Sequence, residues 1–128
     1  MRTTTANELV AAARGRVENL SVDQVAIELA AGDALLVDLR EPEERRQHGA
    51  IPGDVHAPRG ILEFYADPIS PYYRAEFDPS RRVILYCGSG SRSALGAETL
   101  GLLGYARVAH LDGGFAAWKQ AGQPTELN

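Results

Sequence analysis

The segment at residues 82–103 constrains the fold most, because it predicts a strand that runs through a glycine-containing loop into a helix. Residues 82–86 (RVILY) are apolar and partly β-branched, which is typical of a buried strand. The six residues that follow, Cys87-Gly88-Ser89-Gly90-Ser91-Arg92, form the loop, and a helix is predicted from Ser93 to about Leu103, where Gly104 ends it. Units of this kind build α/β folds.

The rest of the chain alternates short apolar segments with helical ones. Strands are predicted at residues 34–39, 54–57 and 106–111, and helices at 42–48 and 115–121. Two capping boxes, Thr5-Ala6-Asn7-Glu8 and Ser21-Val22-Asp23-Gln24, each open a helix near the beginning of the chain, and these helices end at Gly15 and Gly32. Residues 58–80 carry four of the seven prolines and form a long connection with helical turns predicted around 61–66 and 71–77.

This alternation predicts a central parallel sheet of about five strands with helices on both faces. The chain has 128 residues, near the commonest size of one domain, so residues 1–128 are predicted to form a single domain. In such sheets, ligands bind beyond the carboxyl ends of the strands. Asp38, Arg40 and Cys87 all lie at predicted strand ends, and the chemistry is expected there.

Composition excludes several classes of function. Thirteen basic and seventeen acidic residues give a net charge of −4, which offers no basic footprint for nucleic acid or for an anionic membrane. No apolar run approaches the ~18 residues that a membrane span needs. The apolar stretch near the N-terminus is short and is interrupted by Glu8 and Arg14, which does not fit a secretory signal. A cytoplasmic location is therefore expected.

Cys87 is the only cysteine, so an intramolecular disulfide, a cysteine-rich zinc site and a two-cysteine redox cycle are all excluded. The three histidines, His48, His56 and His110, lack the spacing of metal ligands and are expected in the core or on the surface. Neither a metal nor a cofactor is predicted.

The loop that begins at Cys87 predicts an anion-binding cradle. Gly88 and Gly90 permit backbone angles that a side chain would forbid, so that amide groups of residues 88–93 can point toward a common centre. The N-terminus of the following helix adds positive potential, and Arg92 adds a full charge. These features favour a thiolate, so Cys87 is predicted to be an activated nucleophile, although a lone cysteine at a strand end is more often a small buried hydrophobe.

Four motifs in order resemble the single-domain rhodanese (sulfurtransferase) family over nearly the whole chain. The first, Val37-Asp38-Leu39-Arg40-Glu41, is similar to the family's Asp-x-Arg after a buried strand, and residues 49–60 (GAIPGDVHAPRG) are similar to its second signature. Here Ala50 stands for the usual histidine and Asp54 for the usual alanine, both at positions that are usually scaffold. Residues 86–93 (YCGSGSRS) match its active-site loop, and 111–118 (LDGGFAAW) match its C-terminal signature.

The resemblance implies a rhodanese-like fold and the transfer of a sulfane sulfur through a Cys87 persulfide. Thiosulfate or mercaptopyruvate would be the donor, and a thiol, cyanide or a sulfur-accepting protein the acceptor. The loop itself carries no charge between Cys87 and Arg92, and its Cys-Gly-Ser-Gly start is similar to loops of mercaptopyruvate sulfurtransferases. Weak affinity for thiosulfate, a compact dianion, is therefore expected.

The candidate site has a catalytic pair, Cys87 and Arg92, and supporting residues. The residues expected to bind the donor are those of the loop: Gly88, Ser89, Gly90, Ser91 and Ser93. Asp38 is expected to bond loop amides or to fix Arg40. The resemblance places Arg59 near the mouth of the pocket, where it could attract an anionic donor, and Arg40 is expected to have a similar role. The run Arg40–Arg46 (REPEERR) is interpreted as the solvated face of a short helix.

Two other functions compete with sulfur transfer. A phosphatase or arsenate reductase on this scaffold would use Cys-x5-Arg to surround a tetrahedral oxyanion, whereas here Ser93 stands where that arginine would fall. Arsenate reductases that cycle through protein thiols also need further cysteines. A non-enzymatic binding or regulatory module is the other alternative, but such modules commonly lose the cysteine that this chain keeps.

Overall fold

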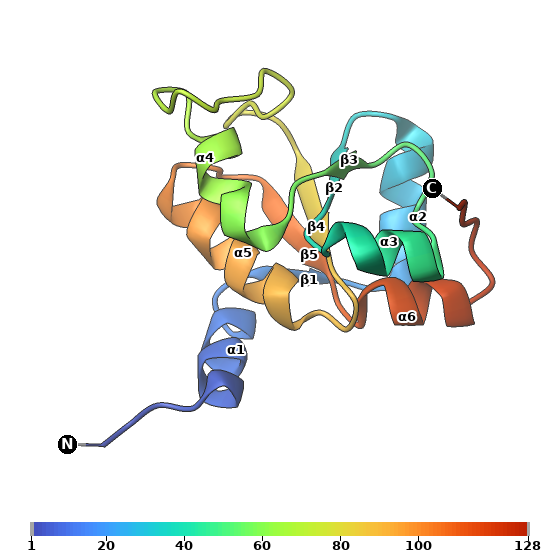
Figure 1. The fold of residues 1–128 in the computed structure, drawn as a ribbon, viewed down its shortest axis with the longest axis horizontal. Helices are drawn as coiled ribbons and strands as arrows, with labels where there is room; N and C mark the ends of the chain where they lie inside the picture. Colours follow the sequence, from blue (N-terminus) through green and yellow to red (C-terminus); the bar gives the residue numbers. More distant parts are fainter. Residues whose placement is uncertain (1, 128) are drawn as a thin grey trace.

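The computed structural model describes residues 2–127 as one five-stranded parallel sheet with helices on both faces (Figure 1). The elements, in chain order, are α1 (Ala6–Arg14), β1 (Glu18–Leu20), α2 (Val22–Ala31), β2 (Leu35–Asp38), α3 (Pro42–His48), β3 (Val55–His56), the 3₁₀ turn η1 (Arg59–Ile61), α4 (Leu62–Ala66), β4 (Val83–Tyr86), α5 (Ser91–Leu102), β5 (Val108–Leu111) and α6 (Gly114–Gln120). The predicted fold class is confirmed.

The strand order is β1-β5-β4-β2-β3, so that β4 lies at the centre of the sheet. Asp38 at the end of β2 is in register with Tyr86 at the end of β4, and Leu85 of β4 is in register with His110 of β5. Because all the strands are parallel, their carboxyl ends meet at one edge. The residue after Tyr86 is Cys87, which therefore lies at the middle of that edge.

Each face of the sheet has its own apolar core. On one face, β2 and β4 side chains pack with α4 and α5, including Leu62, Ala97 and Leu100. On the other face, Leu36 and Ile84 belong to a core that also holds Trp118 of α6. Within residues 2–127, no helix combines the length and the apolar character needed to cross a bilayer.

Three details of the sequence prediction were wrong. No strand is predicted at residues 18–20, but these residues form β1, which pairs with β5 although two of the three stay exposed. Residues 71–77 form turns and no helix, although η1 and α4 account for the helical turns expected around 61–66. The helix expected from Ser93 begins at Ser91, which shortens the loop after Cys87.

The packing of α5 on the sheet depends on Gly96. A Cβ atom at this position would lie 2.8 Å from Cδ1 of Leu39 and 3.1 Å from Cδ2 of Leu62. We expect Gly96→Ala to lower the free energy of unfolding by about 1–3 kcal/mol, the usual cost of overpacking a core. Gly101→Ala in the same helix meets nothing within 4 Å and is expected to stabilise the protein by about 0.5–1 kcal/mol. Urea unfolding of both variants tests this, and equal effects would contradict it.

Candidate active site

Cys87 leaves β4 and is held by the short turn that leads into α5. Its side chain is fully buried. The backbone N–H of Gly90 donates to Sγ over 3.1 Å, and Sγ lies 3.6 Å from Oγ of Ser93. Gly90 has a φ of 103° and is the N-cap residue of α5, so the sulfur lies beside the positive end of a twelve-residue helix. This geometry favours negative charge on the sulfur.

The start of α6 holds the loop from the other side. The N–H of Phe115 donates to the carbonyl of Cys87 over 2.8 Å, and the N–H of Ala116 donates to the carbonyl of Gly88 over 3.1 Å. A Cβ atom at Gly114 would lie 2.6 Å from the Gly88 carbonyl oxygen and 2.7 Å from that of Cys87. The glycine of the C-terminal motif is therefore needed for the close approach of α6 to the loop.

Asp38 is the centre of a buried ionic network and contacts two arginines. Its carboxylate accepts from the backbone and side chain of Arg40, with the shortest contact 2.9 Å, and from Nη1 of Arg45 over 2.7 Å. Arg45 also donates to Asp54, which accepts from the Tyr86 hydroxyl over 2.5 Å. Burial lowers the pKa of Arg45, but its hydrogen bonds to Asp54 and Asp38 outweigh that effect and raise the pKa above its ordinary value.

The interpretation of Arg40–Arg46 as a solvated face was therefore wrong for Arg40 and Arg45. Arg40 is only 2% exposed, and its guanidinium lies over the ring of Phe115, 4.3 Å from the centroid. It also donates to the carbonyl of Gly49 over 2.7 Å. The Asp38 carboxylate thus fixes Arg40, and this pair anchors the end of β2 next to the loop.

Arg92, in the first turn of α5, pairs with Glu44 of α3. Its two terminal nitrogens donate to the two carboxylate oxygens over 2.8 and 2.9 Å. This bidentate bond is the main reason why the pKa of Glu44 falls to about 2, although partial burial opposes the shift. The charge of Arg92 is thus already paired with a carboxylate, and no sequence motif places Glu44 near the loop.

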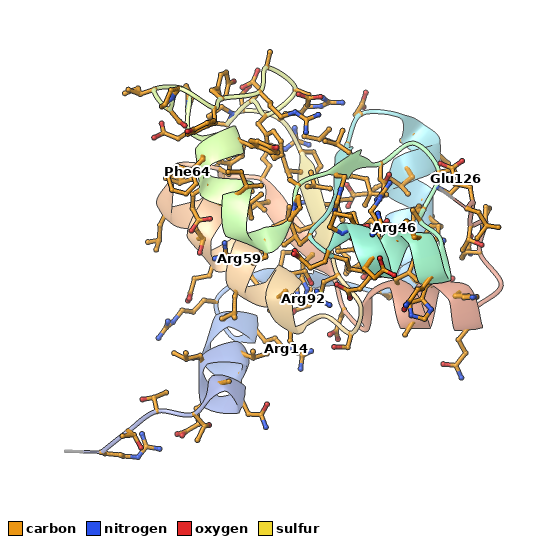
Figure 2. The ribbon with its side chains drawn as sticks, viewed as in Figure 1. Arg14, Arg46, Arg59, Phe64, Arg92 and Glu126 are labelled. Atoms are coloured by element: carbon orange, nitrogen blue, oxygen red, sulfur yellow. The ribbon has the colours of Figure 1, made fainter. Side chains whose placement is uncertain are left out.

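Arg14 is a second cation at the loop, and sequence reasoning missed it. It comes from the end of α1, and a Cβ atom at Gly90 would lie 3.2 Å from its Nη2 atom. Its Nε atom lies 3.8 Å from Asp112, a loose and half-exposed ion pair. Figure 2 labels both Arg14 and Arg92 beside the beginning of α5. No motif marks Arg14, because it is 73 positions before Cys87 and reaches the loop only through the packing of α1 on α5.

Arg59 does not join the residues that surround the Cys87 loop. It donates to Glu63 over 2.8 Å and to the hydroxyl of Thr99 over 3.2 Å, and so links α4 to α5. A cavity of about 550 Å³ adjoins the loop at Gly88, and Arg59 is not among its lining residues. Its lining includes three basic residues, Arg40, His48 and Lys119. Ser89 is exposed, while Ser91 and Ser93 belong to the first turn of α5.

The fold and the site define an α/β protein with a buried cysteine that follows the central strand of a parallel sheet and accepts a backbone N–H at the start of a helix. The model of the family described as "Rhodanese-like domain" matches residues 21–121. A sulfurtransferase of Allochromatium vinosum is 38% identical over 92 residues, which make up 72% of this chain and 78% of that protein. The chain belongs to the rhodanese-like family, in which sulfurtransferases are found.

Two solved structures extend the comparison. A Rhodopseudomonas palustris protein of unknown function, named as a possible tyrosine phosphatase, has a TM-score of 0.91 at 38% identity, with 98% of this chain and 97% of that chain covered. The polysulfide-sulfur transferase homodimer of Wolinella succinogenes has a TM-score of 0.77 at 27% identity, with 94% of this chain and 85% of that chain covered.

Proposed function

We propose that this protein is a sulfurtransferase that carries a sulfane sulfur as a persulfide on Cys87. The observation that carries the proposal is the position of the only thiol, which accepts the Gly90 N–H over 3.1 Å at the positive end of α5. An amide donor and a helix N-terminus stabilise a thiolate and also the terminal anion of a persulfide. Membership of a family that contains sulfurtransferases supports the same chemistry.

The proposed reaction has two displacement steps at sulfur. The Cys87 thiolate attacks the outer sulfur of thiosulfate, the S–S bond of the donor breaks, and sulfite leaves with the bonding electron pair. Cyanide or a thiolate then attacks the outer persulfide sulfur, and the electron pair of that bond returns to Cys87. With mercaptopyruvate, the carbon–sulfur bond breaks instead and pyruvate leaves after taking up the thiol proton. One cysteine is sufficient for this ping-pong cycle.

Steady-state kinetics tests the proposal directly. Thiocyanate formation from donor and cyanide should give parallel double-reciprocal lines, because the donor's product leaves before the acceptor reacts. The same preparation should not release phosphate from p-nitrophenyl phosphate. The phosphatase alternative predicts phosphate release and no thiocyanate. The loop disfavours this alternative, because it has four residues between Cys87 and Arg92 and not five. The non-enzymatic alternative predicts neither product.

The pairing of Arg92 with Glu44 predicts how an anionic donor binds. Glu44→Gln removes a carboxylate from the lining of the cavity and with it the negative charge that pairs with the Arg92 guanidinium. In a solvated site, a unit charge about 4 Å from a bound anion changes the binding free energy by about 1 kcal/mol. The KM for thiosulfate should therefore fall about three- to tenfold. Glu43→Gln is the matched control, since Glu43 pairs with Arg46 on the exposed face of α3. Equal KM values for the two variants would contradict the prediction.

The choice of donor rests on the charge of the loop. Ser89 is exposed, so a lysine there fits at the surface beside Cys87. We expect Ser89→Lys to lower KM for thiosulfate, with a gain that shrinks at high salt because exposed charges are screened. We expect a lower KM for mercaptopyruvate than for thiosulfate in the unmodified protein. A lower KM for thiosulfate, or no effect of the lysine, would show that loop charge does not set the preference.

A further inference from the structure

A chain of polar side chains connects Cys87 to the outer edge of the sheet. Oγ of Ser93 lies 3.6 Å from the Cys87 sulfur and 2.8 Å from Nδ1 of His110, and Nε2 of His110 lies 2.7 Å from Oδ1 of Asn19. Ser93 and His110 are fully buried, on α5 and β5, whereas Asn19 lies on the exposed edge strand β1. Neither the proposed displacement steps nor the family motifs use His110 or Asn19.

The hydrogen bonds of Asn19 determine the tautomer of His110. The Asn19 amide nitrogen donates to the carbonyls of Arg14 and Val17 over 3.0 and 3.1 Å. Since a carbonyl can only accept, this nitrogen is the NH₂ group, and the oxygen of the same amide faces His110. Nε2 of His110 therefore carries a hydrogen. In the neutral ring Nδ1 is then a bare acceptor, and it faces Ser93.

This tautomer also orients the Ser93 hydroxyl. Its hydrogen has two acceptors in range, Nδ1 of His110 at 2.8 Å and the Gly90 carbonyl at 3.3 Å. The hydroxyl hydrogen is donated to Nδ1 of His110, because this contact is the shorter one and Nδ1 has no other donor in the chain of hydrogen bonds. The Ser93 oxygen is then free to accept from the Cys87 S–H. In the thiol state every group of the chain has a partner.

The surroundings of His110 favour the neutral ring while Cys87 is a thiol. Burial is the main cause that lowers the pKa of His110, and the charge of Arg14 acts in the same direction. Asp112, directly after β5, opposes them and raises it. The titratable groups that face the ring are thus Arg14 from α1, Asp112 after β5, and Cys87 through Ser93 of α5. A neutral imidazole is able to accept a proton.

We propose that Ser93 and His110 form a proton relay that takes the Cys87 proton when the thiolate forms. The inference rests on the proposed role of Cys87 as nucleophile. The S–H bond breaks and its proton passes to the Ser93 oxygen, while the hydroxyl proton of Ser93 passes to Nδ1 of His110. The products are a thiolate and an imidazolium, with no change in net charge and no proton lost to solvent.

After the proton transfer, the same groups remain hydrogen-bonded, and the two bonds of Ser93 are reversed in direction. Nδ1–H of the imidazolium donates to Ser93, the Ser93 hydroxyl donates to the thiolate, and Nε2–H still donates to Asn19. The thiolate then has two donors, Ser93 and the Gly90 N–H. His110 is accordingly a positioning residue that acts through Ser93 and stores the proton, and Asn19 holds it in the tautomer that leaves Nδ1 open.

The test follows both ends of the relay without any sulfur donor. The ultraviolet absorbance of the thiolate is titrated against pH, and NMR chemical shifts of the His110 ring nitrogens are recorded in the same range. In the unmodified protein, thiolate and imidazolium should coexist near neutral pH. Alkylation of Cys87 with iodoacetamide should return His110 to the neutral form with hydrogen on Nε2. A ring that stays neutral while the thiolate is fully formed would overturn the relay.

The variants separate the relay from a structural role. His110→Asn can still bond Ser93 but cannot take a proton, so the thiolate midpoint should rise by about one pH unit or more, and alkylation near neutral pH should slow about tenfold. Ser93→Ala should give the same shift, and the double variant no further one. Tyr105→Phe also removes a buried hydrogen bond, to the Ala66 carbonyl, and should not move the midpoint. An unshifted midpoint in both single variants would refute the proposal.

These measurements are independent of the reaction. Loading of the unmodified protein with sulfur from thiosulfate or mercaptopyruvate is scored separately by mass. Failure to load with an intact relay would contradict the proposed function alone, and loading with an unshifted midpoint in the variants would contradict the relay alone.

Discussion

Replacing Cys87 with serine is expected to abolish sulfur loading and thiocyanate formation while leaving the fold intact. The change is nearly isosteric, and serine can still accept the Gly90 N–H and contact Ser93, so the buried site keeps its partners. A hydroxyl cannot form a persulfide, and the chain has no other thiol to replace it. The fall in kcat should be at least about 10³-fold, the effect of removing a covalent nucleophile.

Far-ultraviolet circular dichroism and urea unfolding, measured alongside thiocyanate release, check this expectation. The free energy of unfolding should change by less than about 1 kcal/mol, as expected for a change that preserves volume and hydrogen bonds. Turnover near that of the unmodified protein would show that the sulfur is not carried on Cys87.

Asp38→Ala is expected to have the largest effect on stability. The Asp38 carboxylate is fully buried and is bonded to Arg40, which is only 2% exposed. Its removal leaves the Arg40 charge buried beside Phe115 without its carboxylate, and breaking a buried pair in this way costs about 3–5 kcal/mol. Arg45 keeps Asp54 as a partner, so the loss should centre on Arg40.

Arg46→Ala is the matched control for this change. It removes an ion pair with Glu43 from the same stretch of chain, but both side chains are more than half exposed, and such pairs contribute about 1 kcal/mol at most. The midpoints of urea unfolding of the Asp38→Ala and Arg46→Ala variants test this difference. Similar losses for the two variants would show that the buried network at the edge of the sheet does not hold this part of the fold.

The elements that the sequence predicted best are those whose cause is local. β4 is a run of apolar residues, and the Cys87 loop carries its glycines and its arginine within six positions. The two N-terminal capping boxes were also present as predicted, because each of them involves only four consecutive residues. Such features depend on backbone geometry that neighbouring residues impose.

The parts that could not be predicted depend on long-range packing. β1 has only three residues and two of them are exposed, so its strand character comes from pairing with β5 and from no pattern of its own. Arg14 and Glu44 reach the Cys87 loop from α1 and α3, and nothing near them in the sequence indicates it. Arg40 and Arg45 belong to a charged run that is typical of an exposed helix face. They are nevertheless largely buried, because they form ion pairs with the buried carboxylates of Asp38 and Asp54.

Intact-mass spectrometry of the protein after incubation with donor tests the central claim most directly. The unmodified protein, mixed with thiosulfate or mercaptopyruvate and then freed of donor, should gain the mass of one sulfur atom, located on Cys87 by peptide mapping. Cyanide should remove that mass and release one equivalent of thiocyanate. No added sulfur with either donor, or added sulfur that cyanide does not remove, would contradict the account.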